Sequence, residues 1–133
     1  MLNLFCDGAS KGNPGLSAIG VSAKRTEESP EEIFSISELI GQNTNNIAEW
    51  TALLRGLERS IHLGEKDLRV YMDSELVVKQ MKGIYKTKHP GLIPIKKQVD
   101  ELVTHLNSFE IIHIRREKNK RADELANLAY NQN

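Results

Sequence analysis

The spacing of the apolar residues changes near Asn46, and this change limits the folds that the chain can adopt. Before it, three largely apolar stretches at 1–7, 16–25 and 32–41 have the composition of strands joined by short polar connections. After it, apolar residues recur every three or four positions as far as Ile61, and Gly64 follows as a helix stop. The pattern predicts an antiparallel three-stranded meander followed by an amphipathic helix.

Strands and helices alternate in the rest of the chain. Strands are predicted at 68–72 and 109–114, and helices at 74–83, 94–107 and 121–130. Strands separated by helices favour parallel crossovers. The predicted order is β-β-β-α-β-α-α-β-α, an α/β fold with one mixed five-stranded sheet, antiparallel over its first three strands, and helices packed on it. We expect a single domain over residues 1–133, with Trp50 and Cys6 in its core.

Composition restricts the class of protein. The chain is 39% hydrophobic and 27% charged, which is ordinary for a globular protein. It lacks any apolar run near the roughly 20 residues of a membrane helix, and its first residues lack the order of a signal peptide. With one cysteine, no disulfide within the chain is possible. We therefore predict a cytoplasmic protein that does not contact membranes.

The formal net charge is zero, but the charges are unevenly distributed. Residues 76–99 contain six lysines and no acidic residue, and a second basic run covers 115–121. Both runs are compatible with solvated faces, and both are compatible with a surface that binds a polyanion.

Four carboxylates lie at predicted element boundaries: Asp7, Glu49, Asp73 and Asp123. Each has an ordinary structural explanation. Asp7 is followed by glycine and suits a turn, and Glu49 stands three residues after Asn46, as in a capping box. Asp73 directly precedes a helix, where it would cap the helix or complement its dipole, and Asp123 lies in a first helical turn, where acids are favourable.

Taken together, the four acids indicate a metal site. If the strands ending near Asp7 and Asp73 are neighbours, their carboxyl ends share one rim, where ligands of α/β proteins bind. Carboxylates that converge without basic partners repel one another unless they bind cations. Oxygen ligands favour Mg²⁺ or Mn²⁺, and a pair of such ions about 4 Å apart can support phosphodiester cleavage.

Four motifs, DGASKGNPG, TNNIAEW, YMDSELV and NKRADELAN, make the chain resemble type 1 ribonuclease H from residue 2 to about residue 130. The resemblance implies a metal-dependent endonuclease that cleaves RNA paired with DNA. It implies two bound Mg²⁺ or Mn²⁺ ions in the presence of substrate, with Asp7, Glu49, Asp73 and Asp123 as catalytic metal ligands. An RNA/DNA hybrid is the implied partner, and we expect a monomer without an obligate protein partner.

The same resemblance implies a set of substrate contacts. Gly8, Gly12 and Gly15 allow the backbone to approach a minor groove, with Ser10, Gly12 and Asn13 near the scissile site. Asn45 is expected to read the groove, and Glu75 to contact a 2′-hydroxyl where many members have glutamine. Thr44 and Asn46 are expected in a pocket for a DNA phosphate, with helix capping as the alternative for residues 44–46. The complete predicted contact set is Gly8, Ser10, Gly12, Asn13, Thr44, Asn45, Asn46 and Glu75.

Two departures from the family pattern leave other functions open. The loop before Asp123 lacks the histidine that many members carry, and His113 is predicted to lie in a strand, which leaves Arg116 or Lys118 to take part of its role. The basic segment after the predicted helix at 74–83 is short and lacks tryptophan, so weaker binding is expected. These features resemble the shorter, reverse-transcriptase-like branch of the family. A weakly active or inactive hybrid-binding protein is therefore the alternative to an enzyme. A third interpretation, another nuclease on the same fold, does not explain DGASKGNPG.

Overall fold

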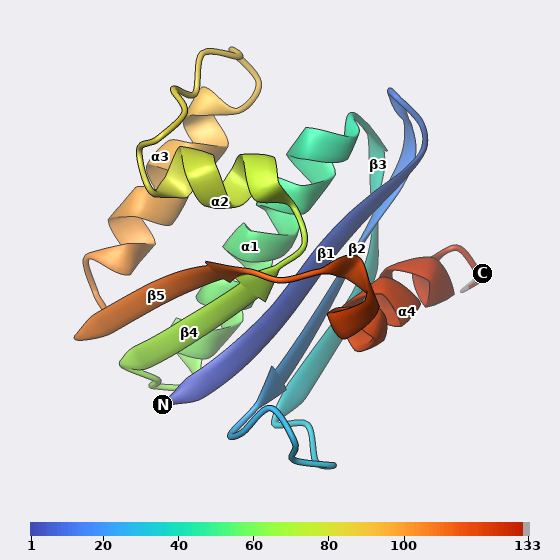
Figure 1. Cartoon of the computed structure of the whole chain (residues 1–133). Coiled ribbons are helices and arrows are strands. Elements are labelled where there is room, and N and C mark those ends of the chain that lie inside the picture. Colours follow the sequence, from blue (N-terminus) through green and yellow to red (C-terminus); the bar gives the residue numbers. More distant parts are fainter. Residues whose placement is uncertain (132–133) are drawn as a thin grey trace.

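The computed structural model describes residues 1–131 and contains the predicted order of elements (Figure 1). The strands are β1 (Leu2–Gly12), β2 (Gly15–Lys24), β3 (Phe34–Asn43), β4 (Asp67–Met72) and β5 (Ser108–His113). The helices are α1 (Asn45–His62), α2 (Glu75–Met81), α3 (Ile93–Val103) and α4 (Lys120–Ala129), with a 3₁₀ turn at Arg116–Lys118. Within residues 1–131, no helix combines the length and the hydrophobicity needed to cross a bilayer.

The five strands form one mixed sheet in the order β3-β2-β1-β4-β5. Antiparallel pairing joins β1 to β2 and β2 to β3, whereas β4 pairs parallel with β1 and with β5. The predicted antiparallel first half and parallel second half are confirmed. Helix α1 covers one face of the sheet, with α2 and α3 beside it, and α4 covers the other face over β1, β2 and β3 (Figure 1).

The core lies between the sheet and α1. Leu2, Leu4 and Cys6 alternate along β1 and are fully buried against this helix. Trp50 on α1 is fully buried as well, and its indole Nε1 donates a hydrogen bond of 2.8 Å to Oε1 of Gln80 on α2. The predictions that Trp50 and Cys6 belong to the core are confirmed.

Two glycines allow helices to lie directly on the strands. A β-carbon on Gly8 would stand 2.3 Å from the Ala48 carbonyl carbon in α1. A β-carbon on Gly20 would stand 2.0 Å from the Ala122 carbonyl oxygen in α4. Because these neighbours are backbone atoms, any larger side chain would force a helix away from the sheet.

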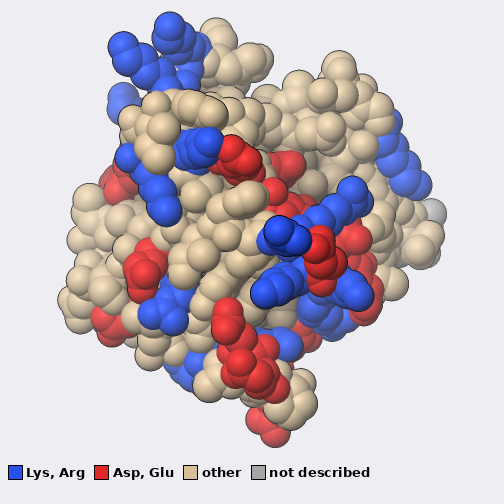
Figure 2. Space-filling view, viewed as in Figure 1, with Lys and Arg blue, Asp and Glu red and all other residues tan. Residues whose placement is uncertain are grey.

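Charged residues gather in distinct places on the surface (Figure 2). One basic group covers the segment between α2 and α3, and a second surrounds the start of α4. In the second group Arg121 pairs with Glu32 and Glu124, so acids neutralise much of its charge. In the first group Lys86 and Lys88 are exposed, and no acidic side chain among residues 1–131 pairs with them.

We predict that Gly20→Ala lowers the free energy of unfolding by about 1–3 kcal/mol, because α4 must shift away from β2. Chemical denaturation at neutral pH measures this change. Gly56→Ala is a matched control, since a β-carbon there meets only side-chain atoms at 3.3–3.4 Å and the position is inside a helix. Equal stability of Gly20→Ala and the wild type would contradict the close approach of α4.

Candidate active site

Asp7 lies where β1 passes beyond the end of β4. The parallel register of these strands ends with the pair Cys6 and Met72, so Asp7 and Asp73 are the next residue on each chain. β1 continues through Asp7 to Gly12, paired with β2 alone. The prediction that the first strand ends at Asp7 is therefore wrong, and so is a turn role for this residue. Its carboxylate instead occupies the rim predicted for Asp7 and Asp73, where β1 loses one neighbour.

The other two carboxylates, Glu49 and Asp123, lie on α1 and α4, the two helices that pack closely on the sheet at its glycines. Gly8 brings the backbone of Ala48 and Glu49 in α1 against β1. Gly20, which faces Asp7 across the β1–β2 ladder, brings the first turns of α4 against the opposite face of the sheet. Asp123 lies in the first turn of α4, as predicted. The four carboxylates therefore come from four elements and meet at one end of the β1–β4 seam.

Two of the proposed capping roles are wrong. Thr44 is the N-cap of α1, and its Oγ1 accepts a hydrogen bond of 3.2 Å from the Ile47 backbone. Glu49 therefore falls beyond the first turn, where it cannot complete a capping box. Ser74, not Asp73, caps α2 in the same manner. Neither acid is needed to begin its helix.

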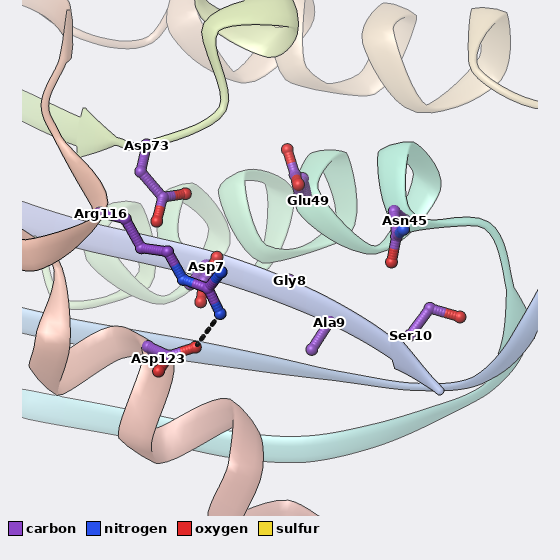
Figure 3. Close-up of a pocket in the computed structure, with 9 residues that line it drawn as sticks. All are labelled: Asp7, Gly8, Ala9, Ser10, Asn45, Glu49, Asp73, Arg116 and Asp123. Atoms are coloured by element: carbon purple, nitrogen blue, oxygen red, sulfur yellow. Dashed lines mark ion pairs between the residues drawn. The ribbon is translucent and has the colours of Figure 1, made fainter. Parts of the chain in front are cut away.

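The carboxylates line one cavity of about 400 Å³ (Figure 3). Its lining consists of backbone and side chains from β1, α1, the segment after β4, the 3₁₀ turn and α4: Asp7, Gly8, Ala9, Ser10, Asn45, Glu49, Asp73, Arg116 and Asp123. Asp7 is 7% exposed and lies at the base of this cavity. Four acids and one guanidinium thus share a small polar space.

Burial and mutual repulsion raise the pKa of Asp7 and of Glu49 in this cavity. The pKa of Asp7 is raised to about 8, mainly by burial, and further by the charges of Asp73, Asp123 and Glu49 and by a hydrogen bond with Asp123. The pKa of Glu49 is raised to about 7, mainly by burial, with a smaller contribution from Asp73. Without cations, the site therefore retains protons at neutral pH.

Arg116 supplies the positive charge within this cavity. Its guanidinium stands 4.0 Å from Oδ1 of Asp123, as the dashed line in Figure 3 marks. Burial raises the pKa of Asp73, and the charge of Arg116 opposes that rise. The sequence placed Arg116 only in the loop where the family often has histidine. The structure brings it to the acids, whereas His113 is the exposed last residue of β5.

The donor set suits hard divalent cations, although the side chains do not enclose one as they stand. Among residues 1–131, no three His, Cys, Asp or Glu side chains are arranged to coordinate a single ion. Like-charged carboxylates are expected to turn apart when no cation lies between them. Carboxylate oxygens are the ligands that Mg²⁺ and Mn²⁺ prefer, and here they lie on elements that already converge. The residues present therefore fit such ions after side-chain rotation.

The tip that joins β1 to β2 carries three of the predicted substrate contacts. Ser10 lies at the mouth of the carboxylate cavity, and its hydroxyl donates a hydrogen bond of 3.0 Å to the Asn43 carbonyl. Asn13 Oδ1 accepts a hydrogen bond of 3.1 Å from the Asn45 backbone. Gly12 has a φ of +106°, which favours glycine in the turn. These contacts tie the tip to the start of α1.

Thr44 and Asn46 line a second cavity, of about 450 Å³. The basic segment between α2 and α3 contributes Lys86 and Lys88 to the same cavity. Thr44 caps α1 and also lines this cavity, whereas the buried Oδ1 of Asn46 accepts no hydrogen bond from the residues that the structure describes. A polar cavity with two lysines suits a phosphate group.

Glu75 lies apart from both cavities, on the exposed first turn of α2. Its carboxylate pairs with Lys79 Nζ at 2.5 Å, and this hydrogen bond lowers the pKa of Glu75. An ionised Glu75 can only accept a hydrogen bond from a 2′-hydroxyl. Its predicted contact with RNA stays a prediction.

Asn119 is a positioning residue that sequence reasoning missed. It is 1% exposed, and its Nδ2 donates a hydrogen bond of 2.9 Å to the Cys6 carbonyl, next to Asp7. Its own carbonyl accepts from the Asp123 backbone at 3.1 Å. This one residue thus joins the strand of Asp7, through its side chain, to the helix of Asp123, through its backbone. Its place four residues before Asp123, just ahead of the predicted helix, was the available signal.

Comparison with known proteins shows which families and structures this chain resembles. A family model described as "Reverse transcriptase-like" matches residues 5–129. A bifunctional protein of Mycobacterium tuberculosis is 37% identical over 121 residues, which are 91% of this chain and 33% of that protein. The chain thus spans about a third of the length of its mycobacterial relatives.

Solved structures match over nearly the whole chain. RNase H1 from the halophilic archaeon Halobacterium salinarum superimposes with a TM-score of 0.91 at 36% identity, over 98% of this chain and 97% of that chain. LC11-RNase H1, isolated from compost and solved in complex with an RNA/DNA hybrid, gives 0.90 at 38% identity, with coverage of 98% and 97%.

The sheet order and the four-acid rim define a ribonuclease H-like α/β protein. Because the family model and the RNase H1 structures both match across almost all of it, this chain belongs to the type 1 ribonuclease H family. The resemblance inferred from four short motifs is confirmed.

We predict that the metal-free protein loses stability as the pH rises from about 5 to about 8. Asp7 and Glu49 have raised pKa values in the folded state, so this state binds more protons than the unfolded chain over that range. Each extra proton reduces the free energy of unfolding by about 1.4 kcal/mol per pH unit. Denaturant titrations in chelator at several pH values measure the slope.

Asp7→Asn should flatten this slope, because the amide does not titrate. Asp100→Asn, on the exposed side of α3, is the matched control and should leave the slope as in the wild type. A stability that rises between pH 5 and pH 8 in chelator would contradict the crowded, proton-binding site.

Proposed function

We propose that this protein is a divalent-metal-dependent endonuclease that hydrolyses the RNA strand of RNA/DNA hybrids. The observation that carries the proposal is the convergence of Asp7, Glu49, Asp73 and Asp123 in one cavity beside the β1–β2 tip. Membership of the type 1 ribonuclease H family supports it, as does the hybrid bound to LC11-RNase H1. Because the chain spans only part of its mycobacterial relatives, the proposal concerns this chain alone.

The four carboxylates are proposed to hold the metal. Two Mg²⁺ or Mn²⁺ ions bound there would activate a water and stabilise the leaving 3′ oxygen during phosphodiester hydrolysis. Burial raises the pKa of Asp7 to about 8, so Asp7 must release its proton before it can act as a ligand. Arg116 can donate hydrogen bonds to phosphate oxygens at the cavity, where it would stabilise the anionic substrate or product.

The β1–β2 tip is proposed to read the minor groove of the hybrid. RNA is distinguished from DNA by its 2′-hydroxyls, which both donate and accept hydrogen bonds. The Ser10 hydroxyl donates its proton to backbone carbonyls, so its oxygen remains free to accept from a 2′-hydroxyl. Asn45 lines the carboxylate cavity and presents an amide on the same side.

The second cavity is proposed to receive a phosphate of the DNA strand. Thr44 and Asn46 supply polar groups at the start of α1, and Lys86 and Lys88 supply charge. The segment between α2 and α3 thus provides a short counterpart of the longer basic handle of other members. That the bound ions are Mg²⁺ or Mn²⁺, that the protein is a monomer and that it is cytoplasmic all remain predictions.

The direct test is cleavage of an RNA/DNA hybrid labelled on either strand, with Mg²⁺ and Mn²⁺ in parallel. We expect cuts within the RNA strand and none in duplex DNA. Asp7→Asn and Asp73→Asn should each reduce the rate by more than the roughly 10–100-fold that loss of an outer-shell partner costs, because they remove ligands. Both variants should still bind the hybrid.

The control for this test is Asp100→Asn, which should cleave like the wild type. Absence of cleavage by excess folded wild-type protein in both metals, with binding retained, would instead identify the hybrid-binding alternative. Full activity of Asp7→Asn would show that the rim acids are not the metal ligands.

We further predict that Lys86→Gln combined with Lys88→Gln flattens the dependence of hybrid affinity on salt. Each lost phosphate contact reduces the slope of log affinity against log salt by about 0.9. Fluorescence anisotropy with a labelled hybrid at several salt concentrations measures the slope. Lys66→Gln is the control, since Lys66 lies outside both basic runs and lines neither of the two cavities. A slope equal to that of the wild type would show that the segment between α2 and α3 does not touch the phosphates.

A further inference from the structure

Helix α4 connects two parts of the proposed active site. Its first turn carries Asp123 at the carboxylate cavity, and Tyr130 is the C-cap residue at its other end. The position of Tyr130 beyond the last helical turn brings its ring to the β1–β2 hairpin, defined here as residues 8–17. Tyr130 is absent from the four motifs that indicated the family.

The Tyr130 side chain makes three contacts with this hairpin. Its hydroxyl donates a hydrogen bond to the Leu16 carbonyl at 2.9 Å, and the Ala9 carbonyl lies 3.3 Å away as a second acceptor. The ammonium of Lys11 stands 4.2 Å from the centre of the ring, a cation–π contact. Leu16 and Lys11 face each other in the ladder, so Tyr130 touches both strands of the hairpin.

The hairpin extends beyond the end of β4, and Figure 1 shows this arm of β1 and β2 rising past that end. β4 pairs with β1 only as far as Cys6, so residues 8–12 of β1 have a strand on one side only. The β2 half of the arm pairs with β3 as well, from Gly15 opposite Asn43 to Ser17 opposite Gly41. The β1 half is therefore the free edge of the sheet here, and contacts from outside the sheet help to set its orientation.

Besides the pairing of β2 with β3, side-chain contacts hold the arm from two opposite sides. On the α1 side, Asn13 accepts a hydrogen bond from the Asn45 backbone, and Ser10 donates one to the Asn43 carbonyl. On the α4 side, Tyr130 contacts Ala9, Lys11 and Leu16. Ala9 also lines the carboxylate cavity, so the Tyr130 contact lies next to the proposed catalytic centre.

We propose that Tyr130 is a positioning residue, which holds the β1–β2 hairpin in the orientation that meets the minor groove of an RNA/DNA hybrid. It acts through Ser10, Gly12 and Asn13 and does not itself touch the reacting atoms. The inference rests on the proposed function, because it names the surface by which the same site recognises its substrate. It assigns to the end of α4 a role in recognition, beside the role of its first turn in metal binding.

The test compares three variants. Tyr130→Phe removes the hydroxyl and keeps the ring beneath Lys11, Tyr130→Leu removes both, and Leu128→Ala is a control at the same end of the helix, where the side chain is exposed. For each variant we would measure KM and kcat on a hybrid, the Kd for the hybrid in chelator, and amide hydrogen exchange over residues 8–17.

Loss of one hydrogen bond predicts that Tyr130→Phe raises KM and Kd by about 3–10-fold, with a larger rise for Tyr130→Leu. At saturating hybrid, kcat should stay within about twofold of the wild type, because the metal ligands are untouched. Amide exchange should accelerate in residues 8–17 and remain unchanged around Asp123. Leu128→Ala should match the wild type in every measurement.

The outcomes separate this inference from the proposed function. If the wild type binds the hybrid but does not cleave it, the proposed function fails, and the Kd values alone decide the role of Tyr130. Wild-type KM and Kd in Tyr130→Leu would overturn the inference even if the hairpin exchanges faster or the protein melts earlier. A wild type that neither binds nor cleaves a hybrid would overturn both.

Discussion

The site depends on the approach of two helix backbones to the sheet on either side of Asp7. Gly8 follows Asp7 along β1 and faces α1, while Gly20 stands opposite Asp7 on β2 and faces α4. At both positions a β-carbon would fall within 2.3 Å of a helix backbone atom. One helix carries Glu49 and the other carries Asp123. The distances of these two carboxylates from Asp7 therefore depend on the absence of a side chain at Gly8 and at Gly20. The spacing of these carboxylates in the proposed catalytic site is thus part of the packing of the fold.

This packing has an electrostatic cost. It places four carboxylates at the end of one seam, where burial raises the pKa of Asp7 to about 8 and that of Glu49 to about 7. The metal-free protein reduces the repulsion in two ways: it retains protons, and it brings Arg116 from the 3₁₀ turn to Asp123. Cations would replace the protons and allow the acids to rotate inward. The repulsion among the carboxylates of the metal-free site would be relieved by divalent cations, which favours their binding.

Much of this structure was predictable from local sequence patterns, and what was missed depends on contacts between distant residues. The order of the strands and helices, the burial of Trp50 and the location of Asp123 in a first helical turn follow from periodicity and from the chemistry of helix ends. The continuation of β1 past Asp7 was missed, because small residues after it obscure the alternation of a strand whose partner is β2. Thr44 was not separated from Asn45 and Asn46 as the cap, because all three residue types cap helices. The need for glycine at position 20 and the role of Asn119 depend on partners about a hundred residues away.

The placement of Asp123 and Tyr130 on the last described helix has a consequence for biosynthesis. Strands β1 to β3 and helix α1 are synthesised first, and they already contain Asp7, Glu49 and the arm that is proposed to meet the hybrid. While residues 120–130 remain in the ribosome, however, the face of β2 at Gly20 lacks its covering helix, the fourth carboxylate is missing and the arm lacks its contacts with Tyr130. A nascent chain can therefore collapse around α1 before it has a complete site. Under the proposed function, such an intermediate would lack one metal ligand until α4 has left the ribosome and packed on the sheet.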